Sequence, residues 1–180
     1  LNIYDIPGLV RFALRTGFKL DEYSSLGFKY TLAYRDVDGI NYASASPAII
    51  AQEGGTIKSS IGATYTWDAL DNPVRPTLGF RGQIDSEIAG LGGDAYFGRL
   101  EAHGWFFYPL YEESIVLKLE GNAGHIEAFN GTDVPLQDRF FKGAESFRGF
   151  AQSGVGPRQN GNDDTTDSIG AQSYAIGTAE

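Results

Sequence analysis

The 180-residue sequence contains no cysteine and no methionine, and its 14 basic residues are outnumbered by 23 acidic ones. Without cysteine the chain has neither a disulfide framework nor a thiolate nucleophile. The formal net charge of −9 disfavours nucleic acid as a partner, because a nucleic-acid-binding surface must be basic to neutralise phosphates. A chain without methionine does not begin at its own initiation codon, so we expect it to be processed or to be an excerpt of a longer protein.

Long apolar runs are also missing, since none reaches the roughly 18 residues that a transmembrane helix needs. Apolar residues recur instead at every second position, which is the period of a β-strand rather than of a helix. From Leu9 to Leu20, for example, one parity is apolar and the other carries arginine and lysine. The same pattern predicts seven strands, at about 9–20, 23–34, 57–68, 78–87, 96–108, 115–122 and 168–180.

This alternation fits either a soluble antiparallel sandwich or the wall of a membrane β-barrel. The predicted strands run about ten to fifteen residues, whereas strands of soluble proteins average about five or six. Short turns alternate with long connections, and aromatic residues gather near the strand ends, as in outer-membrane barrels. We therefore predict an all-β fold: an antiparallel transmembrane β-barrel, of which this chain supplies about seven strands.

The predicted connections place the long loops at one end of this barrel. Short turns are expected at 20–23, 71–76 and 109–113, and longer or glycine-rich connections at 36–56, 89–94 and 130–167. Seven strands form only an arc, and an open sheet edge in lipid leaves backbone groups unpaired at about several kcal/mol each. We therefore interpret residues 1–180 as one partial barrel domain that needs further strands on both sides.

The longest connection contains the segment Arg139–Phe150, which holds four phenylalanines in what should be a loop. Loops normally lack large apolar side chains because they lie on the surface. We predict that this segment docks into the barrel, and that Arg148 meets an anionic partner there.

Three groups of residues occur in a fixed order along the chain. They are the turn with Asp71, Pro73, Pro76 and Gly79, the turn with Gly92, Gly93 and Asp94, and the long loop with Gly143, Phe147, Arg148, Gly149, Phe150, Gly156, Pro157 and Arg158. This ordered set, which spans nearly the whole chain, resembles the BamA family of outer-membrane assembly factors. That family belongs to the bacterial surface antigen superfamily, together with TamA, two-partner secretion transporters, and mitochondrial and chloroplast relatives.

The resemblance implies a sixteen-stranded barrel preceded by periplasmic POTRA domains, which this sequence lacks together with the terminal barrel strands. It also implies that the long extracellular loop docks in the lumen, with an arginine held by an acid of the inner wall. Carried over to this chain, the arginine is Arg148, flanked by Phe147, Gly149 and Phe150, and the acid is Glu180. Phe147 departs from the family pattern, because many members have valine there.

By this resemblance the chain is part of a non-enzymatic insertase of the bacterial cell outer membrane, with no cofactor or metal. The implied partners are unfolded outer-membrane protein clients, assembly-complex lipoproteins bound through the absent POTRA domains, and outer-membrane lipid. Client strands would be templated by strand addition at a barrel seam. A polypeptide secretion pore of the same superfamily is the alternative.

Other functions find less support in the sequence. A barrel phospholipase would need Ser, His and Asn together, but His103 and His125 are the only histidines and no Gly-x-Ser-x-Gly is present. Two histidines also make a poor zinc site without cysteines or carboxylates at ligand spacing. Asp163, Asp164 and Asp167 lack the spacing of a calcium loop and are interpreted as a solvated acidic segment.

Overall fold

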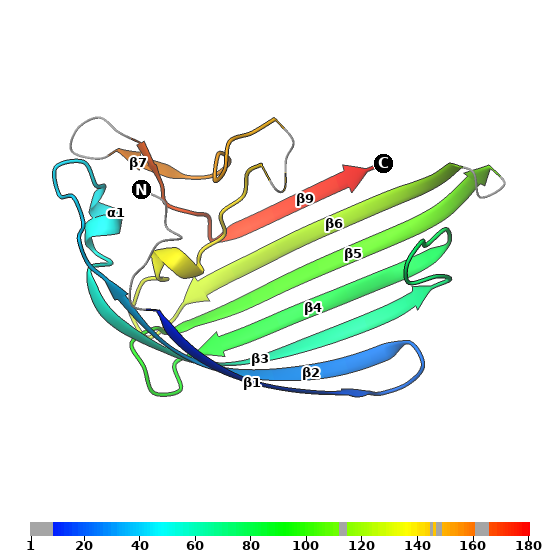
Figure 1. The fold of residues 1–180 in the computed structure, drawn as a ribbon, viewed down its shortest axis with the longest axis horizontal. Coiled ribbons are helices and arrows are strands. Elements are labelled where there is room, and N and C mark those ends of the chain that lie inside the picture. The colour runs from blue at the N-terminus through cyan, green and yellow to red at the C-terminus, as the bar shows by residue number, and fades with distance from the viewer. Residues whose placement is uncertain (1–8, 112–114, 145, 147–148, 161–165) are drawn as a thin grey trace.

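A computed structural model describes residues 9–111, 115–144, 146, 149–160 and 166–180. These residues form one seven-stranded sheet in the order β1-β2-β3-β4-β5-β6-β9 and a two-stranded sheet of β7 and β8 (Figure 1). The strands are β1 (Val10–Lys19), β2 (Ser24–Val37), β3 (Gly54–Leu70), β4 (Gly79–Ala89), β5 (Phe97–Tyr111), β6 (Ile115–Ala128), β7 (Arg158–Asn160), β8 (Thr166–Ser168) and β9 (Ser173–Ala179). The helix α1 (Pro47–Ile50) and the 3-10 helix Leu136–Asp138 lie in the two long loops.

All seven predicted strands of the large sheet are confirmed, and each pairs antiparallel with its neighbour. Several boundaries differ from the prediction. Strands β2 and β3 are a few residues longer than predicted, and β6 runs to Ala128 rather than to residue 122. Strand β5 continues through an irregularity at Pro109 to Tyr111, so the turn predicted from residue 109 begins later. Strand β9 begins at Ser173 rather than near residue 168, because residues 166–168 pair with β7 inside the loop.

The two faces of the sheet differ in chemistry. The predicted outward parity is apolar and exposed, as Val10 (68%), Ile84 (49%) and Leu100 (53%) illustrate. The opposite parity carries most of the side-chain ion pairs and hydrogen bonds of the sheet. A sandwich would bury the apolar parity between two large sheets, whereas the described residues form a single large sheet. The barrel-wall prediction is therefore confirmed, as an open arc with β1 and β9 at its edges.

The loops meet over one end of this arc (Figure 1). Backbone amides of the β2–β3 loop donate to side chains of the β6–β9 loop, at Ser46 to Asp167 (2.9 Å) and Ala48 to Gln159 (3.0 Å). The amide of Leu136 donates in turn to the Gln52 side chain at 3.2 Å. These contacts confirm that the long loops share one end. Among the described residues, no helix has the length and apolar character needed to cross a membrane.

Candidate functional site

The loop between β6 and β9 docks on the inner wall through a small apolar seat. Val134 and Phe140 are 1% and 4% exposed, and they pack with the wall residues Phe97 and Ile126. The Phe140 ring also meets Tyr174 of β9 edge to face, with 4.7 Å between ring centroids. The predicted docking of an aromatic loop segment is thereby confirmed for Phe140. Burying such a side chain contributes about 1.5–3 kcal/mol, which stabilises the docked position of the loop.

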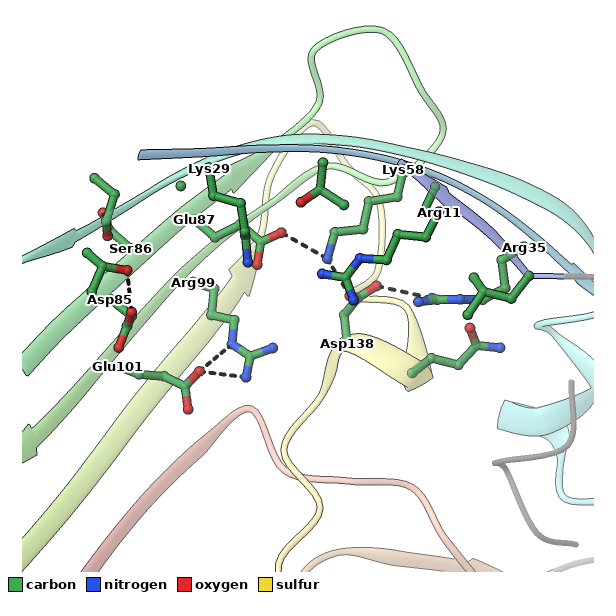
Figure 2. A pocket seen from close by; sticks show the side chains of 17 residues that line it. Arg11, Lys29, Arg35, Lys58, Asp85, Ser86, Glu87, Arg99, Glu101 and Asp138 are labelled. Carbon is green, nitrogen blue, oxygen red and sulfur yellow. Dashed lines mark hydrogen bonds and ion pairs between the residues drawn. The ribbon is translucent and has the colours of Figure 1, made fainter. Parts of the chain in front are cut away.

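A buried carboxylate of the loop continues this contact into the charged part of the wall. Asp138 Oδ1 lies 2.6 Å from Lys58 Nζ on β3, and Asp138 Oδ2 lies 3.5 Å from Arg35 on β2. The same lysine reaches Glu87 of β4 at 3.0 Å, so one cation lies between the loop carboxylate and a wall carboxylate (Figure 2). The Asp138 side chain is 6% exposed and that of Lys58 12%, which leaves these ions weakly screened by solvent. We call Asp138, Lys58, Glu87 and Arg35 the loop-anchoring ion cluster.

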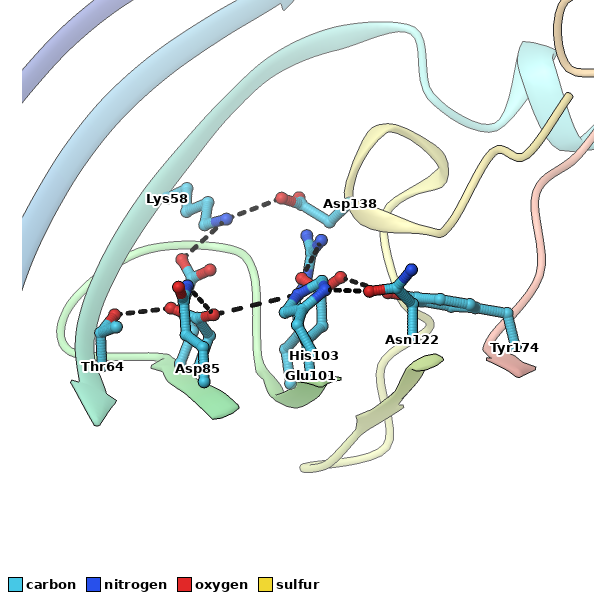
Figure 3. Close-up of polar contacts among 11 residues, drawn as sticks. Lys58, Thr64, Asp85, Glu101, His103, Asn122, Asp138 and Tyr174 are labelled. Atoms are coloured by element: carbon cyan, nitrogen blue, oxygen red, sulfur yellow. Dashed lines mark hydrogen bonds and ion pairs between the residues drawn. The ribbon is translucent and has the colours of Figure 1, made fainter. Parts of the chain in front are cut away.

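A second group of contacts surrounds Phe140. The Arg99 guanidinium lies 4.7 Å from the Phe140 ring centroid and 2.6 Å from the Glu101 carboxylate. Tyr174 donates its hydroxyl to Glu101 at 2.9 Å, as Figure 3 shows. Lys142 of the loop places Nζ 3.9 Å from the Tyr174 ring, and burial lowers the pKa of this lysine. The loop therefore contacts strands β5 and β9 through both charged and aromatic side chains.

The inner wall next to the loop carries further polar contacts. Thr64 donates to Asp85 at 2.6 Å, and His103 Nδ1 lies 2.7 Å from Asn122 Oδ1 (Figure 3). His125 lies on the opposite face of the sheet, where Nδ1 is 2.7 Å from Ser173 Oγ. The two histidines thus face different sides of the wall and share no site. Within the described part of the chain, no three potential metal ligands of the His, Cys, Asp or Glu type come together.

A cavity of about 390 Å³ is lined by inner-wall residues of β1 to β5 and by Gln137 and Asp138 of the loop (Figure 2). Arg11 and Lys29 line it, and neither forms an ion pair within 4.0 Å of another described residue. Three buried polar atoms on the cavity lining have no hydrogen-bond partner among the described residues, namely Thr31 Oγ1, Gln137 Oε1 and Asp138 Oδ2. Because unpartnered buried polar atoms are costly, this part of the docking surface is expected to hold water.

The structure leaves the predicted arginine–acid pairing open. Phe147 and Arg148 lie outside the described residues, Gly149 adopts a positive φ of 94°, and Phe150 is 55% exposed. Glu180 extends the β9 ladder and lies 3.2 Å from Lys118 on β6. The pairing of Arg148 with Glu180 stays a prediction, in which the arginine would join a carboxylate that already has a lysine partner.

The turn between β3 and β4 explains the first group of motif residues. Asp71 accepts hydrogen bonds from the Thr77 hydroxyl (2.6 Å) and from the Thr77 and Leu78 amides, and these bonds lower its pKa to about 2. Gly79 has a φ of 122°, and a Cβ there would lie 2.2 Å from the carbonyl oxygen of Ala69. Pro73 and Pro76 lie within this turn, and Pro73 is exposed. These motif residues therefore belong to a turn in which the Asp71 carboxylate binds backbone amides at the other end of the turn.

The turn between β4 and β5 explains the second group. Asp94 binds the exposed edge of β3, because its carboxylate accepts from the Ile57 amide (2.9 Å) and its own amide donates to the Ile57 carbonyl (2.8 Å). Gly93 lies so close that a Cβ would be 2.6 Å from the same carbonyl, and Gly92 has a φ of 93°. The turn thus satisfies backbone groups that β4 leaves unpaired where it ends.

The third group organises the loop itself. A Cβ at Gly143 would lie 2.4 Å from the Ala151 carbonyl oxygen, so glycine permits the close return of the chain. Gly156 has a φ of 134° just before Pro157, whose carbonyl accepts from the Ile169 amide at 3.1 Å. Arg158 opens β7, opposite Ser168 of β8. In the acidic segment, Asp167 accepts from the Ser46 amide and so is not simply solvated, whereas Asp163 and Asp164 lie outside the described residues.

Sequence reasoning missed Asp138, the acid at the centre of the loop-anchoring ion cluster. The sequence interpretation sought only a loop cation on a wall acid. The described contact has the opposite polarity, with a loop acid on wall cations. The available signal was an acid beside Phe140 in a segment expected to dock, together with wall cations that lacked assigned partners.

Comparison with known proteins gives consistent matches. The model of the Omp85 superfamily domain matches residues 6–180. The chain is 31% identical over 173 residues to the outer membrane protein assembly factor BamA of Neorickettsia risticii, covering 96% of this chain and 22% of that protein. It is 35% identical over 135 residues to a SAM50-like protein of Schizosaccharomyces pombe, covering 72% and 27% of the two chains. The chain therefore spans about a quarter or less of the length of these two relatives.

The fold has a solved counterpart. The crystal structure of BamA from Haemophilus ducreyi lacking POTRA domains 1-3 matches with a TM-score of 0.75 at 20% sequence identity. The match covers 95% of this chain and 36% of the other chain. At this identity the likeness concerns the fold alone.

Proposed function

Because the chain belongs to the Omp85 superfamily, we propose that it forms part of the barrel wall and the docked loop of an outer-membrane β-barrel assembly factor. The names of two relatives support this proposal, since one is an outer membrane protein assembly factor and the other is SAM50-like. These relatives come from a bacterium and a yeast, so the proposal extends to an outer membrane of either origin. The proposed partners are unfolded barrel proteins and membrane lipid, and the proposed action involves no enzymatic step.

The single observation that carries a role for this segment is the ion-paired, buried Asp138. A loop that merely covered the barrel would need no carboxylate with 6% exposure against cations of two strands. Removing one partner of such a cluster leaves uncompensated charge in a poorly solvated place. The contact therefore holds the loop in one position relative to β2, β3 and β4, and it resists changes in the spacing of these strands.

This geometry supports a mechanical role in assembly. Client strands would be added at a sheet edge by backbone hydrogen bonding, which requires a barrel seam that opens while the rest of the wall keeps its shape. The seam is proposed to lie outside these seven strands. The docked loop then acts as an internal brace that keeps the described arc curved while the seam exchanges partners.

The experiment uses the complete protein in proteoliposomes and follows the folding rate of a denatured barrel client. Asp138→Asn, which removes the charge but keeps the shape, is expected to slow client folding several-fold. Asp68→Asn is the matched control, because Asp68 makes an exposed 3.8 Å contact with Arg81 and accepts a long 3.4 Å hydrogen bond from the Leu70 amide. Client folding unaffected by the complete protein would refute the assembly proposal, and a steady ion conductance with a single exported substrate would favour a secretion pore.

A further inference from the structure

The lipid-facing side of the sheet has a hollow of about 450 Å³ at the loop-bearing end of β5. Gly98 lies at its base, in register with Ile88 on β4 and Glu127 on β6. A Cβ placed on Gly98 would meet no heavy atom within 4 Å. Ile88, Leu100 and Phe129 form apolar walls and are 55%, 53% and 44% exposed.

The hollow belongs to the part of the wall that is complete in this chain. Strands β4, β5 and β6 are each paired on both sides, so additional barrel strands would not fill it. From Gly98 to the aromatic residue Tyr108, about ten residues of tilted strand span about 25 Å along the barrel axis, which equals the height of a barrel's apolar band. With Tyr108 at one interface, Gly98 lies at the opposite boundary between hydrocarbon and headgroups.

A polar group borders the hollow at this boundary. His125 Nδ1 lies 2.7 Å from Ser173 Oγ, and His125 Nε2 lies 3.8 Å from Glu127 Oε2. If Ser173 donates to Nδ1, the proton of the neutral ring resides on Nε2, beside the carboxylate. The His125 and Glu127 side chains are 60% and 83% exposed, so both polar groups are accessible to a ligand above the apolar walls.

We propose that this hollow binds one zwitterionic phospholipid, with an acyl chain on Gly98 and the headgroup on His125 and Glu127. The ammonium group would neutralise Glu127, and the phosphate would accept a hydrogen bond from His125 Nε2. Glu127 disfavours a purely anionic headgroup. A lipid is the occupant because the surrounding surface is the outward apolar face that the barrel fold turns to the membrane. This inference goes beyond the proposed function and needs only that fold.

The test is native mass spectrometry of the complete protein, titrated with phosphatidylethanolamine or phosphatidylglycerol in detergent. The wild type is expected to retain phosphatidylethanolamine preferentially. Gly98→Leu fills the hollow and is expected to weaken that retention at least about tenfold. Gly121→Leu is the matched control, because Gly121 lies on β6 on the same face of the sheet as Gly98 and a Cβ there also meets nothing within 4 Å. This variant should retain lipid as the wild type does.

Glu127→Gln provides a second variant that leaves the hollow intact. It is expected to reduce the preference for phosphatidylethanolamine over phosphatidylglycerol about fivefold, as for loss of one charge at a membrane surface. Equal retention of the two lipids by the wild type, or unchanged retention by Gly98→Leu, would overturn the proposal. Lipid retention is measured without a client, so its failure is distinguishable from failure of the assembly function.

Discussion

Substitution of Asp138 tests whether ion pairing, rather than apolar contact alone, holds the loop on the wall. Losing one partner of a buried ion pair typically costs about 3–5 kcal/mol. The expected cost here is smaller, because Lys58 keeps Glu87 at 3.0 Å and the Arg35 side chain is 20% exposed. We expect Asp138→Asn to lower the free energy of unfolding of the complete protein by about 2–3 kcal/mol.

The measurement is guanidinium-induced unfolding in lipid vesicles, combined with limited proteolysis of residues 130–167. The variant should unfold at lower denaturant and be cleaved faster in the loop. Asp68→Asn, the exposed control, should change the unfolding free energy by at most about 1 kcal/mol. A double-mutant cycle of Asp138→Asn with Lys58→Met should show a coupling of at least about 1 kcal/mol.

Two results would refute this reasoning. If Asp138→Asn and Asp68→Asn behave alike, the loop-anchoring ion cluster contributes no more than a surface pair. If the two substitutions of the cycle are additive, Asp138 acts without Lys58, and the 2.6 Å contact is energetically neutral.

The remaining predictions concern the turns and the loop motif. Gly79→Ala should lower the free energy of unfolding by about 2 kcal/mol or more, because φ is 122° and a Cβ would clash with the Ala69 carbonyl oxygen. Gly177→Ala is the control and should be tolerated far better, because a Cβ there meets nothing within 4 Å. The folded-state pKa of Asp71 is lowered from 3.8 to about 2, so its contribution is present above about pH 4 and is lost as pH falls through 2. Stability should therefore decline between pH 4 and 2 more steeply in the wild type than in Asp71→Asn, and equal slopes would contradict the turn's role. Arg148→Ala and Glu180→Ala in the complete protein should each impair barrel assembly or heat resistance, and wild-type growth with unchanged heat resistance of both would argue against their pairing.

The strand pattern shows how much of the fold could be predicted from local chemistry. Val10 to Phe18 alternate with arginine and lysine, and a strand must send such neighbours to opposite faces. The same alternation located β2 to β6. The order of short turns and long connections then predicted that the long loops lie at one end. The turn at 71–76 was also located from the sequence, because turns depend on a few adjacent residues, whereas its closure by Asp71 and the positive φ of Gly79 came from the structure.

The docking of the loop could be predicted only in part. Phe140 was expected to find an apolar seat, but which residues form that seat depends on how β5, β6 and β9 curve together. The contact of Asp138 with Lys58 joins residues 80 positions apart, and no local pattern specifies that separation. The cavity beside Arg11 and Lys29 and the hollow at Gly98 likewise depend on which side chains neighbouring strands bring together.

The sequence by itself determined that these strands alternate in polarity, that they pair in chain order and where their tight turns lie. Each of these properties depends on residues a few positions apart or on consecutive strands. The tertiary structure decided which loop acid meets which wall cation, and where the outer face is hollow. Those depend on strand register and sheet curvature, which bring together side chains that the chain separates by many residues.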